Sequence, residues 1–499
     1  MLLSSNQNPN DCYDVVVIGA GLGGMTVANI LARSGKRVLL LEAHNKLGGF
    51  ATYFRRDLSQ KRSLQIPGLP TIEAEENSHH IFDISLHGFP FGMLKSFRRY
   101  WGEAISKLII PLTDIRFINP EYSIQTSYTR EDFTRILSSH FGVREEVVQS
   151  FFKRVMSVTP NGEEDPQIPV RELFEEFFPG RSDVVRFLME PITYANGHTL
   201  EDPALTYSIV FANFMKHGIY TIQGGTDLLL TLMREELLAN GVDIKFNTLV
   251  AKIEVEVNDN HKSTRGVWVK DQLVQSKVVV SNANLLSTIH SLVGEEKLSL
   301  ALLEKSRQVR LNNSSCQVYI GIKKAHSLPD MGDLVFYSTA SHFDTNLLLS
   351  DKISSRTFSI YYPRLRPPHG RYTIVASSNA RYEDWSELPP SAYESKKLLM
   401  VKETLETLEQ LIPGISSHID YLEAATPLTF ERYTHHQKGS SFGTKFEGLK
   451  VGEHLSQEIQ GLYHCGSVGI IMSGWLGAVN FGVITANNIE RDHFPLSYP

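Results

Sequence analysis

Continuous apolar runs and amphipathic periods alternate along this chain, and they predict its first elements. Residues 15–18 read Val-Val-Val-Ile, an apolar run typical of a parallel strand that is buried on both faces. A helical period follows over 25–34, with Gly35 at its expected end. A second apolar strand covers 37–41. The order strand, helix, strand is typical of an α/β fold with a parallel sheet.

The predicted secondary structure changes twice after these first elements. We expect residues 90–215 to be mostly helical, and the amphipathic periods place helices near 93–107, 130–141, 144–158 and 170–178. The α/β pattern then returns: we expect a helix at 226–240, strands at 243–246, 249–255, 266–269 and 277–281, and a hairpin tip at 258–264.

The last third of the chain is β-rich, and it ends with a strand, a turn and a helix like those at the start of the chain. The pattern predicts strands at 316–322, 334–337, 357–362 and 372–376, a helix at 391–411, and from 461 a strand, a Gly-rich turn and a helix. We therefore expect two discontinuous domains. One comprises 1–90, 216–295 and 431–499, and the other comprises 91–215 and 296–430.

Length and composition restrict the class of protein. A chain of 499 residues exceeds one compact core, and 42% hydrophobic with 21% charged residues is ordinary for a globular protein. A net charge of −6 gives no excess that would attract nucleic acid. Cys12, Cys316 and Cys465 are too few and too scattered for a disulfide framework or a zinc site, which favours a reducing, cytoplasmic compartment.

Two segments could be mistaken for membrane signals. Residues 1–13 are polar and lack an apolar core, so we expect a loose tail rather than a secretory signal. Residues 467–485 carry no charge and have the length of a spanning helix. Their four glycines and Asn480 instead favour a segment that is buried in protein and touches a ligand.

The strongest motif lies between the first two predicted strands. Gly19, Gly21 and Gly24 have the spacing GxGxxG, and Glu42 ends the second strand. Such glycines allow a tight turn and a close approach to a pyrophosphate at a helix N-terminus, and the carboxylate binds ribose hydroxyls. The alternative, a structural turn and an unrelated surface Glu, is disfavoured by this context.

A second Gly pair makes the motif more specific. Gly48 and Gly49 follow Glu42 closely, and this arrangement resembles the glutathione-reductase-like flavoproteins, in the branch with phytoene desaturases, carotenoid isomerases, retinol saturases and amine oxidases. The resemblance implies FAD as cofactor, a Rossmann-type FAD-binding domain, and an interleaved α+β substrate-binding domain. Phe50 stands where many relatives have Arg.

Further matches lie downstream in the same order as in the family. Gly224-Gly225 and the segment ending at Val250 resemble the part that reaches the adenine, and the run from Gly466 to Val479 resembles the last turn and flavin-facing helix, with Ser467 in place of an acidic residue. A Thr-Pro segment at 426–433 also matches. The resemblance implies these cofactor-binding residues: Gly19, Ala20, Gly21, Gly23, Gly24, Glu42, Ala43, Gly48, Gly49, Ala51, Thr52, Val250, Asn282, Ala283, Gly466, Ser467, Gly474, Trp475, Leu476 and Val479.

His87 is the candidate catalytic residue. The run from Phe82 to His87 resembles the Phe-Asp-x-Gly-x-His run of retinol saturases and carotenoid isomerases, with Ser85 in place of Gly. A histidine near the flavin could move protons or position substrate, or it could be a hydrogen-bonded packing residue. His79 and His80 have no third ligand at diagnostic spacing, so we expect no metal site. We expect Cys465 to be buried and apolar in role.

One segment raises the question of membrane contact. Residues 91–108 alternate basic and apolar side chains, a pattern that fits either a helix lying on a bilayer or a core-facing helix with a solvated side. Peripheral membrane contact is therefore an open alternative to a purely cytoplasmic protein.

The sequence thus predicts an enzyme, an FAD-dependent oxidoreductase of the phytoene desaturase-like group. The resemblance implies hydride transfer between a substrate carbon and flavin N5, with a largely apolar substrate and an electron acceptor that the sequence does not identify. Desaturation, saturation and isomerisation stay open. A flavin amine oxidase and a non-catalytic prenyl-binding escort protein of the GDP-dissociation-inhibitor type are the alternatives.

Overall fold

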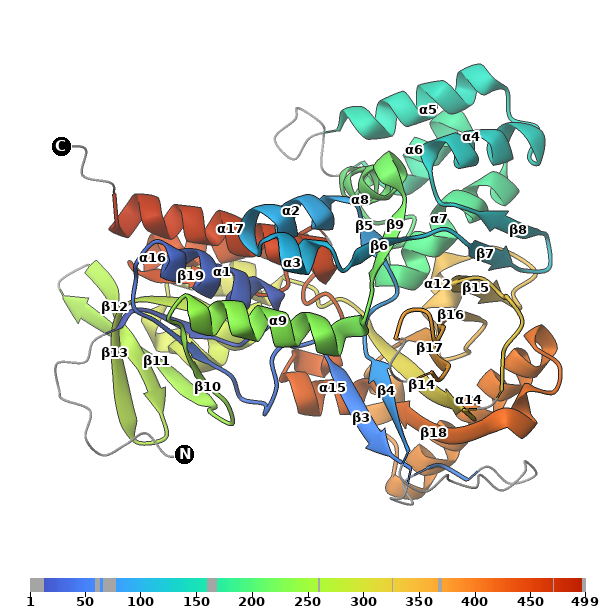
Figure 1. Cartoon of the computed structure of the whole chain (residues 1–499). Coiled ribbons are helices and arrows are strands. Elements are labelled where there is room, and N and C mark those ends of the chain that lie inside the picture. The colour runs from blue at the N-terminus through green and yellow to red at the C-terminus, as the bar shows by residue number, and fades with distance from the viewer. Residues whose placement is uncertain are drawn as a thin grey trace.

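The computed structural model of the chain describes residues 13–58, 63–65, 78–158, 168–258, 261–324, 326–366, 370–469 and 471–495. Two seven-stranded sheets organise these residues, and a bundle of helices lies above the second sheet in Figure 1. The tail predicted at 1–13 lies almost wholly outside the described residues, and so does Cys12.

The first sheet has a parallel centre built from both ends of the chain. Its order is β10 (Asp243–Lys245), β2 (Val38–Leu41), β1 (Tyr13–Ile18), β13 (Gln272–Ser281), β12 (His261–Val269) and β11 (Val250–Asn258), and β19 (Leu462–His464) also pairs with β13. The strands β10, β2, β1, β13 and β19 run parallel, whereas β11 to β13 form an antiparallel meander.

Helices cover both faces of this sheet, as the apolar run of β1 predicts. Val15 and Val17 pack into one core with α1 (Leu22–Arg33), α9 (Gly225–Ala239) and α17 (Gly474–His493). Val16 and Ile18 pack into the opposite core with α11 (Leu300–Arg307) and α16 (Gly448–Glu458). The short helix α10 (Leu285–Ser287) follows β13. Alternate residues of one strand thus face two apolar layers, which explains why no polar residue interrupts the run.

The second sheet separates a helical layer from the cavity described below. Its order is β18 (Ile419–Ala425), β14 (Ser314–Ile322), β17 (Thr373–Ala380), β16 (Ser355–Tyr361), β15 (Leu334–Ser338), β7 (Ile115–Ile118) and β8 (Ser123–Thr126). In β14, Val318 packs toward α14 (Pro390–Leu411), while Gln317 and Tyr319 point to the other side and line the cavity. The period of two therefore gives this strand one apolar and one functional face.

Small elements join the two halves. β3 (Tyr53–Asp57) pairs with β4 (His79–Asp83), and β9 (Ile219–Ile222) lies between β5 (Phe89–Pro90) and β6 (Ile109–Leu112). The remaining α-helices are α2 (Gly92–Tyr100), α3 (Glu103–Ser106), α4 (Arg130–Ser139), α5 (Glu145–Ser157), α6 (Val170–Phe177), α7 (Ser182–Asn196), α8 (Ala204–His217), α12 (Thr345–Leu348), α13 (Glu383–Ser386) and α15 (Pro427–Thr434).

The sequence prediction was wrong in three places. The helix expected at 93–107 is two helices, α2 and α3, because Gly102 adopts a φ of 87° between them. The region 90–215 also contains β6, β7 and β8; β7 is a strand because it pairs with β15, a partner distant in sequence. The hairpin tip expected at 258–264 is shorter, since His261 to Thr264 belong to β12 and pair with β11.

The amphipathic segment turns its apolar side inward. Met93 and Phe97 of α2 are fully buried in the core that contains α17, while Lys95, Arg98 and Arg99 are exposed. Among the described helices, none combines the length and apolarity needed to cross a bilayer.

Candidate functional site

A cavity of about 780 Å³ runs between the first sheet and the second. One end is lined by the β1–α1 turn, the segment after β2, and the start of α17; the other end is lined by α7, α8 and the cavity face of the second sheet. A cavity of this size suits a small-molecule site, for which roughly 300–1,000 Å³ is typical.

The β1–α1 turn presents free backbone to this cavity. A Cβ atom at Gly24 would lie 2.2 Å from Gly19 O, so only glycine permits the turn. The N-cap residue of α1 is Gly21, which has no side chain that could cap this helix end. The first N–H groups of α1 are thus available beside the cavity-lining residues Gly21, Leu22 and Gly23.

Glu42 stands at the end of β2, next to this turn. Its carboxylate accepts hydrogen bonds from the N–H of Ala20 and the N–H of His44, each at 2.7 Å. Burial raises the pKa of Glu42, and those backbone donors oppose the rise. Each carboxylate oxygen can accept a further hydrogen bond, so a fixed acceptor pair faces the cavity.

The second Gly pair holds the following loop against the first turn. Gly48 N–H donates to Ala20 O at 2.8 Å, and a Cβ at Gly48 would lie 2.3 Å from Ala51 O. Gly49, with a φ of 60°, approaches the Cα of Gly21 so closely that its own Cβ would lie 3.3 Å from it. The glycines of the β1–α1 turn and the pair Gly48–Gly49 therefore allow the backbone of the two segments to pack in direct contact.

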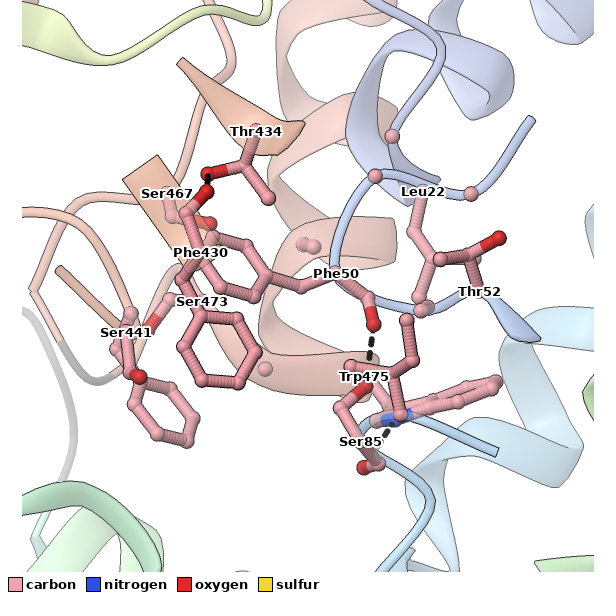
Figure 2. Close-up of a pocket in the computed structure, with 18 of the residues that line it drawn as sticks. Leu22, Phe50, Thr52, Ser85, Phe430, Thr434, Ser441, Ser467, Ser473 and Trp475 are labelled. Carbon is pink, nitrogen blue, oxygen red and sulfur yellow. Dashed lines mark hydrogen bonds between the residues drawn. The ribbon is translucent and has the colours of Figure 1, made fainter. Parts of the chain in front are cut away.

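The N-terminus of α17 faces the same cavity. Ser473 is its N-cap residue without a side-chain cap, and Gly474 follows with a φ of 65°. The Trp475 indole N–H donates to Ser85 O at 3.1 Å, and the Ser85 hydroxyl donates to Phe50 O at 2.8 Å (Figure 2). Two helix N-termini thus bring positive dipole ends to one site, an arrangement that favours an anionic ligand.

The structure brings most of the predicted cofactor-binding residues together on this cavity. Those that line it are Gly19, Gly21, Gly23, Glu42, Ala43, Gly48, Gly49, Ala51, Thr52, Val250, Asn282, Ala283, Ser467, Gly474, Trp475 and Leu476.

Four predicted residues lie behind the lining. Ala20 supports Glu42 through its N–H, and Gly24 packs on Gly19. Gly466 packs against Ala283, where a Cβ would lie 2.2 Å from the carbonyl oxygen, and Val479 is fully buried in the core. These four shape the site without lining it.

Sequence reasoning missed one wall of the site. Phe430, Thr434, His436 and Ser441 line the cavity from α15 and the loop after it, and Figure 2 shows Phe430, Thr434 and Ser441 near Ser467 and Ser473. Phe430 stacks on Phe50 at a centroid distance of 6.0 Å. The Thr-Pro match at 426–433 marked this segment, but no residue type in it indicated a ligand contact.

His87, the candidate catalytic residue, lines the cavity. Its Nδ1 is 2.6 Å from the Ser359 hydroxyl, and its Nε2 is 3.2 Å from the Ser377 hydroxyl. Burial lowers the pKa of His87 to about 4. The imidazole is therefore neutral at pH 7 and held by two serines, which suits a positioning group better than a strong base.

Other chemically suggestive residues lie outside the lining. Cys316 and Cys465 are buried free thiols, and burial raises the pKa of each. The burial of Cys465 agrees with the prediction. His80 is paired with Asp420 at 2.6 Å in the protein interior, and Arg371 contacts the same carboxylate.

The far end of the cavity is apolar. Ile192, Ile209, Val210, Phe214, Leu334 and Phe336 line it. Among the lining residues that the structure describes, Lys46, Arg56, Glu42 and Glu423 carry the charges, and Arg56 pairs with Glu423 at 2.6 Å. The apolar end therefore suits an uncharged, largely apolar molecule.

Comparison with known proteins agrees with this geometry. Residues 17–93 match the family described as NAD(P)-binding Rossmann-like domain. The chain is 23% identical to the chloroplastic prolycopene isomerase of Arabidopsis thaliana over 96% of this chain and 83% of the relative. It is 24% identical to human all-trans-retinol 13,14-reductase over 98% of this chain and 87% of the relative. The resemblance predicted from the sequence is confirmed.

Solved structures extend the resemblance to the fold. An oxidoreductase from Methanosarcina mazei superposes with a TM-score of 0.63 at 16% identity, covering 95% of this chain and 99% of its own. A putrescine oxidase superposes with a TM-score of 0.62 at 13% identity, covering 96% and 99%. The Rossmann-like α/β fold is thus confirmed, whereas the domain boundaries and the roles of individual residues stay predictions.

Proposed function

We propose that this chain is an FAD-dependent oxidoreductase of the phytoene desaturase-like group that acts on a largely apolar small molecule. The observation that carries the proposal is that both ends of the candidate site belong to one cavity. A dinucleotide-suited end, with Gly21 and Glu42, continues without interruption into an apolar end lined by α7, α8 and the second sheet. The named relatives, prolycopene isomerase and retinol reductase, support the substrate class.

The residues present fit FAD. Glu42 would accept hydrogen bonds from ribose hydroxyls, and the uncapped N–H groups after Gly21 would hold the pyrophosphate. The N-terminus of α17, from Trp475 to Gly477, would hold the part of the flavin that becomes negative on reduction. When bound, FAD supplies the capacity for hydride transfer at N5.

The chain's own groups would orient the substrate and exclude water. The apolar end desolvates the molecule it binds, and His87, fixed by Ser359 and Ser377, presents a neutral imidazole to the cavity. His87 is our candidate catalytic residue, with hydrogen-bond positioning as its role. Nothing in the arrangement distinguishes desaturation, saturation and isomerisation.

The cavity disfavours the amine oxidase alternative. Of the acidic side chains on the described lining, Glu42 lies at the dinucleotide-suited end and Glu423 is paired with Arg56, so neither offers a free negative charge to an ammonium group at the apolar end. The escort-protein alternative requires no reducible cofactor.

Cytoplasmic placement, with or without peripheral membrane contact through exposed Lys95, Arg98 and Arg99, is part of the same proposal.

A flavin titration tests the proposal. The purified full chain should bind FAD and show a yellow flavin spectrum, and anaerobic incubation with a conjugated polyene should bleach that spectrum, reoxidise a reduced sample, or isomerise the polyene without a net change in the flavin spectrum. A chain that stays colourless with excess FAD would overturn it. Bleaching by putrescine but not by polyenes would favour an amine oxidase, and bound flavin that no reductant reduces would favour the escort protein.

A further inference from the structure

Tyr128 occupies an unusual position in the wall of the cavity. It lies between β8 and α4 and is a non-glycine residue with a φ of 58°, in the left-handed region. Its N–H donates to the Thr126 hydroxyl at 2.9 Å, and Thr129 then caps α4 through Asp132 N–H. A tyrosine in this conformation is disfavoured, so the surrounding bonds hold the side chain in one place.

The ring of Tyr128 is packed on several sides by aromatic neighbours. Its centroid lies 4.9 Å from that of Phe133, 6.0 Å from that of Phe214 and 6.2 Å from that of Phe117. The residue is 2% exposed, yet it lines the cavity. The aromatic packing therefore leaves the phenol little freedom to turn away.

The hydroxyl of Tyr128 has no hydrogen-bond partner among the described residues. Two other tyrosines of the same lining do have one: Tyr319 donates to Gln317, and Tyr194 donates to Glu190. Burial raises the pKa of Tyr128, so its hydroxyl keeps its proton. Because Tyr128 lines the cavity, a polar group of a bound ligand can accept a hydrogen bond from this hydroxyl.

Asn213 supplies a second polar atom on this side of the cavity. Its side-chain amide donates to Ile209 O at 2.9 Å, within α8. That bond fixes the amide, and the side-chain oxygen has no donor among the residues the structure describes. Apolar neighbours on the same helix, Val210 and Phe214, also line the cavity.

We propose that Tyr128 and Asn213 bind a single hydroxyl group at the end of an otherwise apolar substrate. A hydroxyl can accept from the Tyr128 O–H and donate to the Asn213 oxygen, whereas a hydrocarbon end satisfies neither. A carboxylate would meet the Asn213 oxygen with no cation beside it, because Lys46 lies in the segment after β2 and Arg56 of β3 is paired with Glu423. The inference rests on the proposed function and narrows its substrate class to alcohols.

The test compares two ligands that differ in one group. All-trans-retinol and its deoxy hydrocarbon are titrated into the FAD-loaded full chain, and the two dissociation constants are measured by quenching of protein fluorescence. We expect the wild type to bind the alcohol about tenfold more tightly. Tyr128→Phe should reduce this preference to less than about twofold and leave hydrocarbon affinity unchanged.

The chain provides a matched control. Tyr122 is another buried tyrosine of the same aromatic core, but it does not line the cavity. Tyr122→Phe should keep the preference for the alcohol. If Tyr128→Phe does not fold, as judged by thermal unfolding, Asn213→Leu should remove the preference instead.

Three outcomes overturn the inference: equal affinities in the wild type, a preference that survives Tyr128→Phe in a folded protein, and a chain that holds FAD but binds neither ligand. The proposed function fails separately, if FAD is not bound. An alcohol preference in such a chain would still support the role of Tyr128.

Discussion

The indole N–H of Trp475 donates a hydrogen bond to the backbone carbonyl of Ser85 at 3.1 Å. This bond joins the first turn of α17 to the segment that leads to His87, and the Ser85 hydroxyl continues the link to Phe50 O. Three segments of the candidate site that are distant in sequence therefore share one short chain of hydrogen bonds.

Trp475→Phe should weaken FAD binding and lower the thermal stability. The substitution keeps an aromatic ring near Phe89, on which Trp475 stacks, but it leaves Ser85 O without this donor, a loss of about 1 kcal/mol. Thermal unfolding with and without FAD measures both effects. Trp268→Phe is the control, because Trp268 donates to Glu254 outside the cavity lining. It should change stability and not FAD affinity.

Gly23→Ala should weaken FAD binding by at least about tenfold, equivalent to about 1.4 kcal/mol. A Cβ at Gly23 would lie 2.7 Å from Cys465 O and 2.8 Å from the Asn282 side chain, so the cavity-lining turn must shift. Gly452→Ala adds the same methyl group to α16, where the nearest atom is 3.7 Å away. Equal FAD dissociation constants for the two variants would contradict the placement of the pyrophosphate.

Glu42→Gln should reduce FAD affinity about 10- to 100-fold while the protein stays folded. The amide keeps the shape of the carboxylate, but it loses the charge that strengthens hydrogen bonds from ribose hydroxyls, worth about 1.5–3 kcal/mol. The amide oxygen can still accept from Ala20 N–H, whereas the amide NH2 cannot accept from His44 N–H, so that hydrogen bond is lost. Isothermal titration with FAD gives the change, and an unaltered affinity would place the ribose elsewhere.

Acid should destabilise the protein between about pH 6.5 and pH 4. Burial lowers the pKa values of His87, His436 and His464 to about 4. Below pH 6.5 the unfolded chain binds protons that the folded chain does not, so the free energy of unfolding falls as the pH falls, by up to about 3 kcal/mol per group.

His464→Gln should flatten this pH dependence. The imidazole Nε2 of His464 lies 3.0 Å from Ala283 O, a contact that the Gln amide can imitate. Denaturant unfolding at pH 4.5 and pH 7.5 measures the slope. The exposed His342→Gln should leave the slope as in the wild type; if both variants behave alike, the burial of His464 does not cause the acid sensitivity.

Arg366→Ala should destabilise the fold by about 3–5 kcal/mol. Arg366 pairs with Asp83 of β4 at 2.6 Å and with Asp227 of α9, and it donates to Gly224 O. Its removal leaves Asp83 buried without its cation. Arg171→Ala breaks an ion pair with Glu201 in which both side chains are about 60% exposed, and it should cost less than about 1 kcal/mol. Chemical denaturation compares the two variants.

The dinucleotide-suited end was predictable because its signals are local. Gly19, Gly21 and Gly24 lie within one turn, and Glu42 follows at the end of the adjacent strand, so neighbouring residues determine the geometry. The apolar run of β1 also predicted burial on both faces. The burial of β1 was predictable because the apolar side chains of the strand indicate it, although the covering helices are distant in sequence.

The remaining parts depend on partners that are distant in sequence. The strand β7 exists because Phe117 pairs with Phe336 of β15, and the wall formed by Phe430 exists because α15 packs on Phe50. Tyr128 shows no unusual pattern in sequence, since its left-handed φ follows from the turn between β8 and α4. Such features need the three-dimensional arrangement, which periodicity alone does not give.

The pairing of β19 with β13, together with the packing of α17 against α1, has a consequence for biosynthesis. During translation Ser467 and the N-terminus of α17 emerge from the ribosome only after the several hundred residues that follow the Gly-rich turn. Contacts of such long sequence separation form slowly. A nascent chain therefore presents only the β1–α1 side of the candidate site until α17 has been made and has packed on α1, and binding of the proposed cofactor would report that this packing is in place.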